Sequence, residues 1–230
     1  MKINLLKYSL ITVGAISVLV SIIFGNEHTS YIKPIFHIIL MLFYIQNTKK
    51  INWLLLFAFT SVMIGEYFVS KGLLIHYEVI YLLFFIFFGC CVLLLYPVFK
   101  ETKVNLLAHS TVQMFIGSIG LIAILLSGYF FTVEFLPNYS FFIADFAALS
   151  IFVITCFYIS HFNKHPKSYY LFVVGACYMI VTAGALIYET VIPNPLLLGL
   201  VNLCEILAQF LFVSFLAEIS FKSNYEELPL

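Results

Sequence analysis

Long apolar stretches separated by short polar ones dominate the pattern of this sequence. They cover about residues 5–24, 34–45, 51–69, 77–99, 112–133, 140–160, 168–188 and 196–221. A helix that crosses the hydrocarbon core of a bilayer needs roughly 20 mostly apolar residues, and most of these stretches are about that long. The pattern therefore predicts an all-α fold, a polytopic bundle of eight transmembrane helices that forms one integral membrane domain over residues 1–230.

Prolines and lysines mark the expected helix ends. Pro34 is expected in the first turn of the second helix, where a missing N–H costs no hydrogen bond. Lys2 and Lys7 precede an apolar run from Tyr8 to Phe24, as in a signal peptide. No small-residue cleavage motif precedes Gly25, however, so we expect a retained first helix.

The lysines alternate between the two sides of the predicted bundle. Nine of the eleven fall in the N-terminal segment, the C-terminal segment and every second loop, whereas Lys33 and Lys71 fall on the other side. Cytoplasmic segments of membrane proteins carry the excess of positive charge. The pattern therefore predicts a multi-pass protein of the inner cell membrane, with its N-terminus and C-terminus in the cytoplasm.

Composition excludes several classes of protein. Hydrophobic residues make up 63% of the chain and charged residues 10%, whereas a soluble domain is about 25% charged. The formal net charge is zero, so there is no basic field to attract nucleic acid, and we expect no nucleic-acid partner. The five cysteines lie in apolar stretches without the spacing of metal ligands, which predicts a packing role. The sequence does not determine the oligomeric state.

Ionisable side chains inside the predicted spans are the candidates for function, because charge is costly at membrane depth. Glu66 and Asp145 are the strongest, since each lies at least one helical turn inside a span. From depth along the spans we expect one water-filled pocket in the outer half of the bundle. The expected lining residues are Lys33, His37, Glu66, Glu78, Asp145 and Glu189.

Other positions also have plain structural interpretations. His37 suits a packed core histidine, and Lys33 can extend its amine to the lipid headgroups. Glu205 and Gln209 are four residues apart on one helix face and can join helices by hydrogen bonds. Glu218 lies near the inner interface, where we expect it to be solvated. The sequence leaves the functional and structural interpretations of Lys33, His37, Glu205 and Gln209 open.

Short motifs in these spans resemble the YhhN-type family of eight-helix membrane proteins, whose mammalian members are lysoplasmalogenases. The resemblance is carried by Lys33-Pro34, Ser61-x-x-x-Gly65-Glu66, Ala144-Asp145 and Ala208-Gln209. Two departures are visible. The Gly-Asp pair of the family is Gly65-Glu66 here, and no histidine occurs from Tyr77 to Ala108, where the family carries one in its fourth helix.

The resemblance implies an enzyme that hydrolyses the vinyl-ether bond of lysoplasmalogen-type membrane lipids to a fatty aldehyde and a glycerophospho-amine. Such hydrolysis starts with proton transfer to carbon, passes through an oxocarbenium ion and ends with addition of water. Glu66 and Asp145 would supply an acid and an ionised carboxylate, in an order that stays open. His37 would relay a proton, and Lys33 would hold the lipid phosphate.

We also expect Ser61, Glu205 and Gln209 in the substrate site, and the implied reaction requires neither a metal nor another cofactor. Two different functions remain as alternatives: a non-enzymatic transporter or carrier of a small lipid or of protons, and a structural membrane protein. A pocket closed at its inner end favours the enzyme, and a path that reaches both faces favours transport. Carboxylates dispersed among local hydroxyl partners favour a structural role.

Overall fold

In the computed structural model the chain is helical, as the apolar pattern predicts. The described residues are 2–102, 117–124, 126–128, 130, 136 and 139–226. Their long helices are α1 (Lys2–Phe24), α2 (Asn26–Thr48), α3 (Trp53–Lys71), α4 (Tyr77–Glu101), α6 (Ser140–Phe162), α7 (Tyr169–Thr190) and α8 (Pro195–Glu226). A shorter apolar helix, Gly117–Gly128, lies between α4 and α6 in the sequence.

Seven of these helices are long and apolar enough to cross a membrane. They are α1, α2, α3, α4, α6, α7 and α8, which supports a multi-pass membrane protein. The predicted span over residues 112–133 is described only in part, and that part is helical. Its remaining residues lie outside the described ranges.

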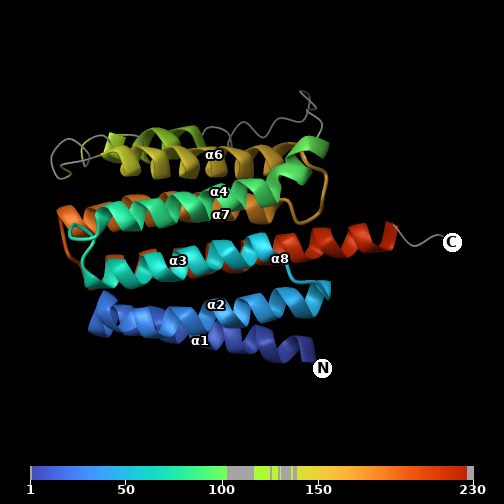
Figure 1. Cartoon of the computed structure of the whole chain (residues 1–230), viewed down its shortest axis with the longest axis horizontal. Coiled ribbons are helices and arrows are strands. Elements are labelled where there is room, and N and C mark those ends of the chain that lie inside the picture. Colours follow the sequence, from blue (N-terminus) through green and yellow to red (C-terminus); the bar gives the residue numbers. More distant parts are fainter. Residues whose placement is uncertain are drawn as a thin grey trace.

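The helices form a ring of neighbours with roughly parallel axes (Figure 1). Contacts join α1 to α2, α2 to α3, α3 to α4, α4 to α6, α6 to α7, α7 to α8 and α8 back to α1. Both chain ends lie at the same end of the bundle (Figure 1), as the expected eight crossings would place them. Which side of the membrane that end faces stays a prediction.

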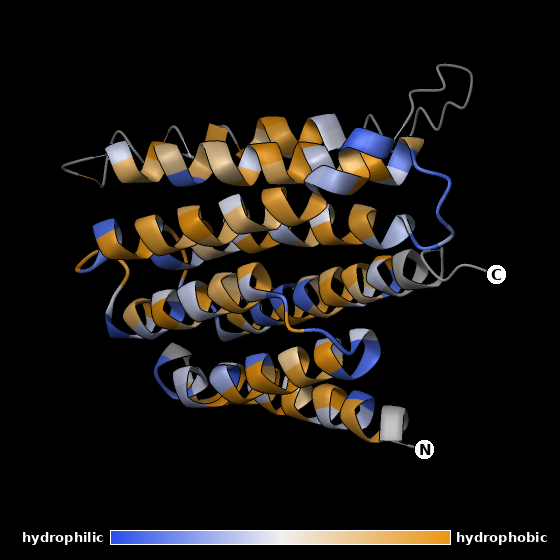
Figure 2. Cartoon of the chain, turned by 45° about the vertical axis from the view of Figure 1, so that its right-hand side comes forward, coloured by the Kyte–Doolittle hydropathy of each residue, from blue (hydrophilic) through white to orange (hydrophobic). Residues whose placement is uncertain are grey.

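Apolar and polar side chains are distributed as lipid requires. Large apolar side chains such as Ile11, Leu93 and Ile151 are exposed on the outside of the bundle. Hydrophobic colour follows the bodies of the helices, and hydrophilic colour gathers at helix ends and connections (Figure 2). The ionisable side chains Lys33 and Glu66 are buried inside, because lipid offers them no hydrogen-bonding partners. All five cysteines are buried and unbridged, in agreement with a packing role.

Helix α2 begins earlier than the sequence pattern predicts. Gly25, with a positive φ of 77°, separates α1 from α2, so α2 starts at Asn26. Pro34 therefore lies inside α2, and its placement in the first turn was wrong. The polar residues before it continue the helix because the tight break at Gly25 leaves no room for a loop. As a result, Lys33 and His37 lie two to three turns into the bundle.

Candidate functional site

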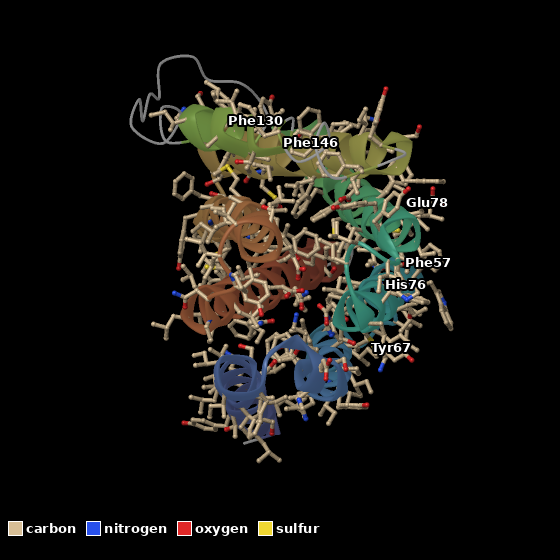
Figure 3. All side chains as sticks on the ribbon, turned by 90° about the vertical axis from the view of Figure 1, so that its left-hand side faces the viewer. Phe57, Tyr67, His76, Glu78, Phe130 and Phe146 are labelled. Atoms are coloured by element: carbon tan, nitrogen blue, oxygen red, sulfur yellow. The ribbon has the colours of Figure 1, made fainter. Side chains whose placement is uncertain are left out.

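A cavity of about 160 Å³ lies inside the helix ring. Its walls come from α2, α3, α4, α6, α7 and α8. Every described lining residue belongs to the half of the bundle where α2 and α8 begin, which is the end that faces the viewer in Figure 3. The cavity therefore runs from this end toward the middle of the bundle, and no described residue of the other half lines it.

Three ionisable side chains from three helices form an ion cluster in this cavity. The Lys33 ammonium on α2 lies 2.7 Å from the Glu205 carboxylate on α8 and 3.6 Å from the Glu66 carboxylate on α3. Lys33 and Glu66 are each 8% exposed and Glu205 is 9% exposed. The alternative that Lys33 extends to the lipid headgroups is therefore wrong. Burial keeps water from weakening these charge pairs.

Gln209 and His37 support the ion cluster without lining the cavity. The Gln209 side-chain amide donates to the second carboxylate oxygen of Glu205 at 3.3 Å, one helical turn away. His37 Nδ1 donates to the backbone carbonyl of Lys33 at 2.8 Å. The His37 ring packs edge-on against Phe59 at 5.4 Å, and its Nε2 has no hydrogen-bond partner among the described residues. His37 therefore lies behind the wall, contrary to the sequence expectation.

Asp145 lines another part of the same cavity, from α6. It is 8% exposed, and its Oδ1 has no hydrogen-bond partner among the described residues. The hydroxyl of Tyr81 on α4 is likewise buried on the cavity wall without such a partner. Glu66 and Asp145 thus share one cavity, as expected. Among the described residues, no lysine or histidine forms an ion pair with Asp145.

Aromatic rings give the cavity a rigid apolar wall. Tyr81 meets Phe142 edge-on at a centroid distance of 5.1 Å. Tyr178 meets Phe88 edge-on at 5.3 Å, and Phe142 stacks on Phe146 at 6.0 Å. All five rings line the cavity. Edge-to-face packing of this kind fixes ring orientation and adds stability beyond area burial.

Two further residues that the sequence places in the site do not line the cavity. Ser61 is buried, but its hydroxyl donates to the Phe57 carbonyl one turn earlier at 3.0 Å, so its hydrogen bond is used within its own helix. Glu78 does not line the cavity and lies at the outer edge of the bundle (Figure 3). Glu218, which we expect to be solvated, is partly exposed and also forms an ion pair with Lys167 at 2.7 Å.

The pairing of Lys33 with Glu205 is the feature that sequence reasoning missed. From the sequence, Lys33 is expected at a lipid phosphate or at the headgroups, and Glu205 at the substrate or between helices. The two residues have opposite charges and lie at similar depths along their spans, and this was the feature of the sequence that could have predicted the pair. Glu189, Asn202 and Glu205 also line the cavity, so the wall carries four carboxyl groups against one lysine among the described residues. Within the described ranges, no cluster of three or more potential metal ligands occurs.

Comparison with known proteins finds no matching family model, no matching curated protein and no matching solved structure. The likeness to the YhhN-type family therefore rests on the sequence motifs, and the chemistry of the cavity has to be argued from its residues.

Proposed function

We propose that this membrane protein hydrolyses the vinyl-ether bond of lysoplasmalogen-type lipids, releasing a fatty aldehyde and a glycerophospho-amine. One observation carries the proposal: Glu66 and Asp145 enter one buried, aromatic-walled cavity from two different helices. Acid-catalysed cleavage of an enol ether needs a proton donor and a nearby negative charge in a site poor in water. The motifs shared with the YhhN-type family point to the same chemistry.

Asp145 is the proton donor in this mechanism. No described cation stands beside it, and a carboxyl group in an apolar site without a cation keeps its proton. The proton moves from Asp145 to the alkenyl carbon that is not bonded to oxygen. The positive charge then forms on the neighbouring carbon and is shared with the ether oxygen.

Glu66 stabilises that oxocarbenium ion as an ionised carboxylate, with Lys33 beside it at 3.6 Å. Water adds to the charged carbon and returns one proton to Asp145. The resulting hemiacetal breaks its bond to the glycerol oxygen, which takes up a proton, and the aldehyde leaves. Lys33 and Glu205 position Glu66 in this scheme, because the lysine already pairs with both carboxylates.

The extent of the cavity argues against an open channel. An open channel needs a continuous route to both faces of the membrane, whereas a carrier with alternating access is open to one face at a time. The described lining residues come from one half of the bundle. Apolar side chains of the wall, among them Val62, Leu149 and Val181, would accompany the alkyl chain of the lipid.

The proposal is tested with purified protein in lipid nanodiscs and a lysoplasmalogen substrate. Wild-type protein should release fatty aldehyde, whereas the matched lysolipid with a saturated ether should stay intact. Glu66→Gln and Asp145→Asn should each lower kcat by about 100-fold or more, the scale of a positioned acid or base. The control Glu218→Gln changes a carboxylate at the opposite end of the bundle and should keep the wild-type rate.

Heavy water tests the proton transfer itself. If the first step protonates carbon, aldehyde formed in heavy water and trapped at once should carry one deuterium next to its carbonyl carbon. Wild-type protein that releases no aldehyde from any lysoplasmalogen would refute the proposed function. Full activity in Asp145→Asn would refute the assigned proton donor.

A further inference from the structure

The cavity wall carries more carboxyl groups than cations. Lys33 is the one lysine among the described lining residues, and Glu205 takes its closest contact at 2.7 Å. Glu66 lies further from the same ammonium, at 3.6 Å, and neither of its oxygens has a hydrogen-bond partner among the described residues. Asp145 and Glu189 add two more carboxyl groups. A cation that enters the cavity can therefore take the place of a carboxyl proton, which passes to water.

Buried polar atoms on this wall also lack partners. Asp145 Oδ1 and the Tyr81 hydroxyl are both without a hydrogen-bond partner in the described part of the chain. Their side chains are more than nine-tenths buried, with 8% and 6% exposure. Burying a polar atom without a partner is costly in free energy, so such atoms point to a ligand that satisfies them.

The rings of the wall favour an organic cation over a simple metal ion. Phe84, Phe88, Phe142, Tyr81 and Tyr178 line the cavity together. Aromatic faces attract ammonium groups, and sets of such faces recognise alkylated ammonium ions. Aromatic and aliphatic walls also accept an alkyl chain, whereas a metal ion prefers several oxygen ligands. Among the described residues no cluster suited to a metal ion exists.

We propose that the cavity binds an amphiphilic organic ammonium ion in exchange for the Asp145 proton, with its cationic nitrogen beside the ionised Asp145 carboxylate and its alkyl chain along the aromatic wall. Glu66 and the Tyr81 hydroxyl contribute to the same subsite. The ligand needs no ether bond, so this binding function is separate from the proposed hydrolysis. The ammonium group can belong to a free alkylammonium ion or to a phospholipid headgroup.

Binding is measured by titration calorimetry on the full chain in nanodiscs of a lipid without an amine headgroup, with empty nanodiscs as the blank. The probes are hexylammonium, 1-heptanol, hexanoate and hexylphosphoethanolamine. Hexylammonium should bind roughly tenfold or more tightly than the uncharged alcohol, the scale of one charge-assisted contact. Hexylphosphoethanolamine binding as tightly as the cation identifies a lipid headgroup as the source, and weaker binding identifies the free ion.

Variants locate the subsite. Asp145→Asn should weaken hexylammonium binding by about tenfold or more while leaving 1-heptanol binding unchanged. Glu66→Gln should also weaken binding of the cation, and it replaces Asp145→Asn if that variant fails to fold. Thermal unfolding shows whether each variant is folded. Glu78→Gln is the matched control, because Glu78 lies at the same end of the bundle but not on the cavity wall.

Equal affinities for the cation, the alcohol and hexanoate would overturn the inference. Unchanged cation binding in folded Asp145→Asn and Glu66→Gln would overturn it as well. None of the probes contains a vinyl ether, so a negative result leaves the hydrolysis proposal standing. Conversely, cation binding by a protein that releases no aldehyde would uphold this inference and refute only the proposed function.

Discussion

Replacement of Lys33 by methionine tests the central feature of the site. The substitution keeps a long unbranched side chain but removes the ammonium that lies 2.7 Å from Glu205 and 3.6 Å from Glu66. Both carboxylates are then left in a buried site without the cation that compensates them. We expect a large loss in the free energy of unfolding.

The size of that loss follows from distance and burial. At 2.7 Å two unit charges attract by about 6 kcal/mol with an effective dielectric constant of ~20. In the intact protein, desolvation of the two ions, which costs several kcal/mol each, offsets much of this attraction. Removing only Lys33 leaves the desolvation cost of Glu205 uncompensated. Truncation of one partner of a buried pair typically costs about 3–5 kcal/mol, and we expect that range here.

The assay is denaturant titration in mixed micelles, followed by circular dichroism. The matched control is Lys167→Met, because the pair of Lys167 with Glu218 has the same 2.7 Å separation while both side chains are 37% exposed. Exposed pairs contribute about 0–1 kcal/mol. The double variant Lys33→Met/Glu205→Gln should recover at least about 1 kcal/mol relative to Lys33→Met, because the unpaired charge is removed.

Two results would refute this reasoning. Equal losses for Lys33→Met and Lys167→Met would show that burial does not set the strength of these pairs. A double variant no more stable than Lys33→Met would show that Glu205 is not the partner whose charge is left unpaired.

Two further predictions concern packing and topology. Gly184→Ala should lower the free energy of unfolding by about 1–3 kcal/mol, because the added Cβ would lie 2.6 Å from the Val201 side chain. Gly89→Ala, whose Cβ meets nothing within 4 Å, should leave stability unchanged or raise it by up to about 1 kcal/mol in the same titration, and equal losses would contradict the packing argument. Reporter fusions after Lys50 and Lys167 should both report the cytoplasm, and a periplasmic signal at either would contradict the predicted topology.

The helices themselves could be read from the sequence because the requirement that creates them is local. In lipid, each backbone N–H and C=O must find its partner within its own helix, so an apolar stretch of sufficient length becomes a helix. The expected span 77–99 appears as α4 over Tyr77–Glu101, and the expected span 140–160 appears as α6 over Ser140–Phe162. The point where one helix ends and the next begins was harder to predict: α2 begins at Asn26, so Pro34 lies inside the helix and not in its first turn.

The depth of the site residues could also be predicted, because depth follows from position along a span. Glu66 and Asp145 were expected in the same half of the bundle, and both line the cavity there. Depth does not say which way a side chain points. Ser61 and His37 lie at suitable depths, yet one donates to its own helix backbone and the other packs behind the wall.

The partners of the buried charges were decided by the tertiary structure alone. Lys33 and Glu205 are 172 residues apart in the chain and meet only because α2 packs against α8. Each membrane helix is apolar on its lipid face and largely apolar on its core face, so its sequence carries little signal of its rotation or its neighbours. The sequence therefore determined which charges enter the membrane and at what depth, and the packing of the ring determined which of them pair and which remain open to a ligand.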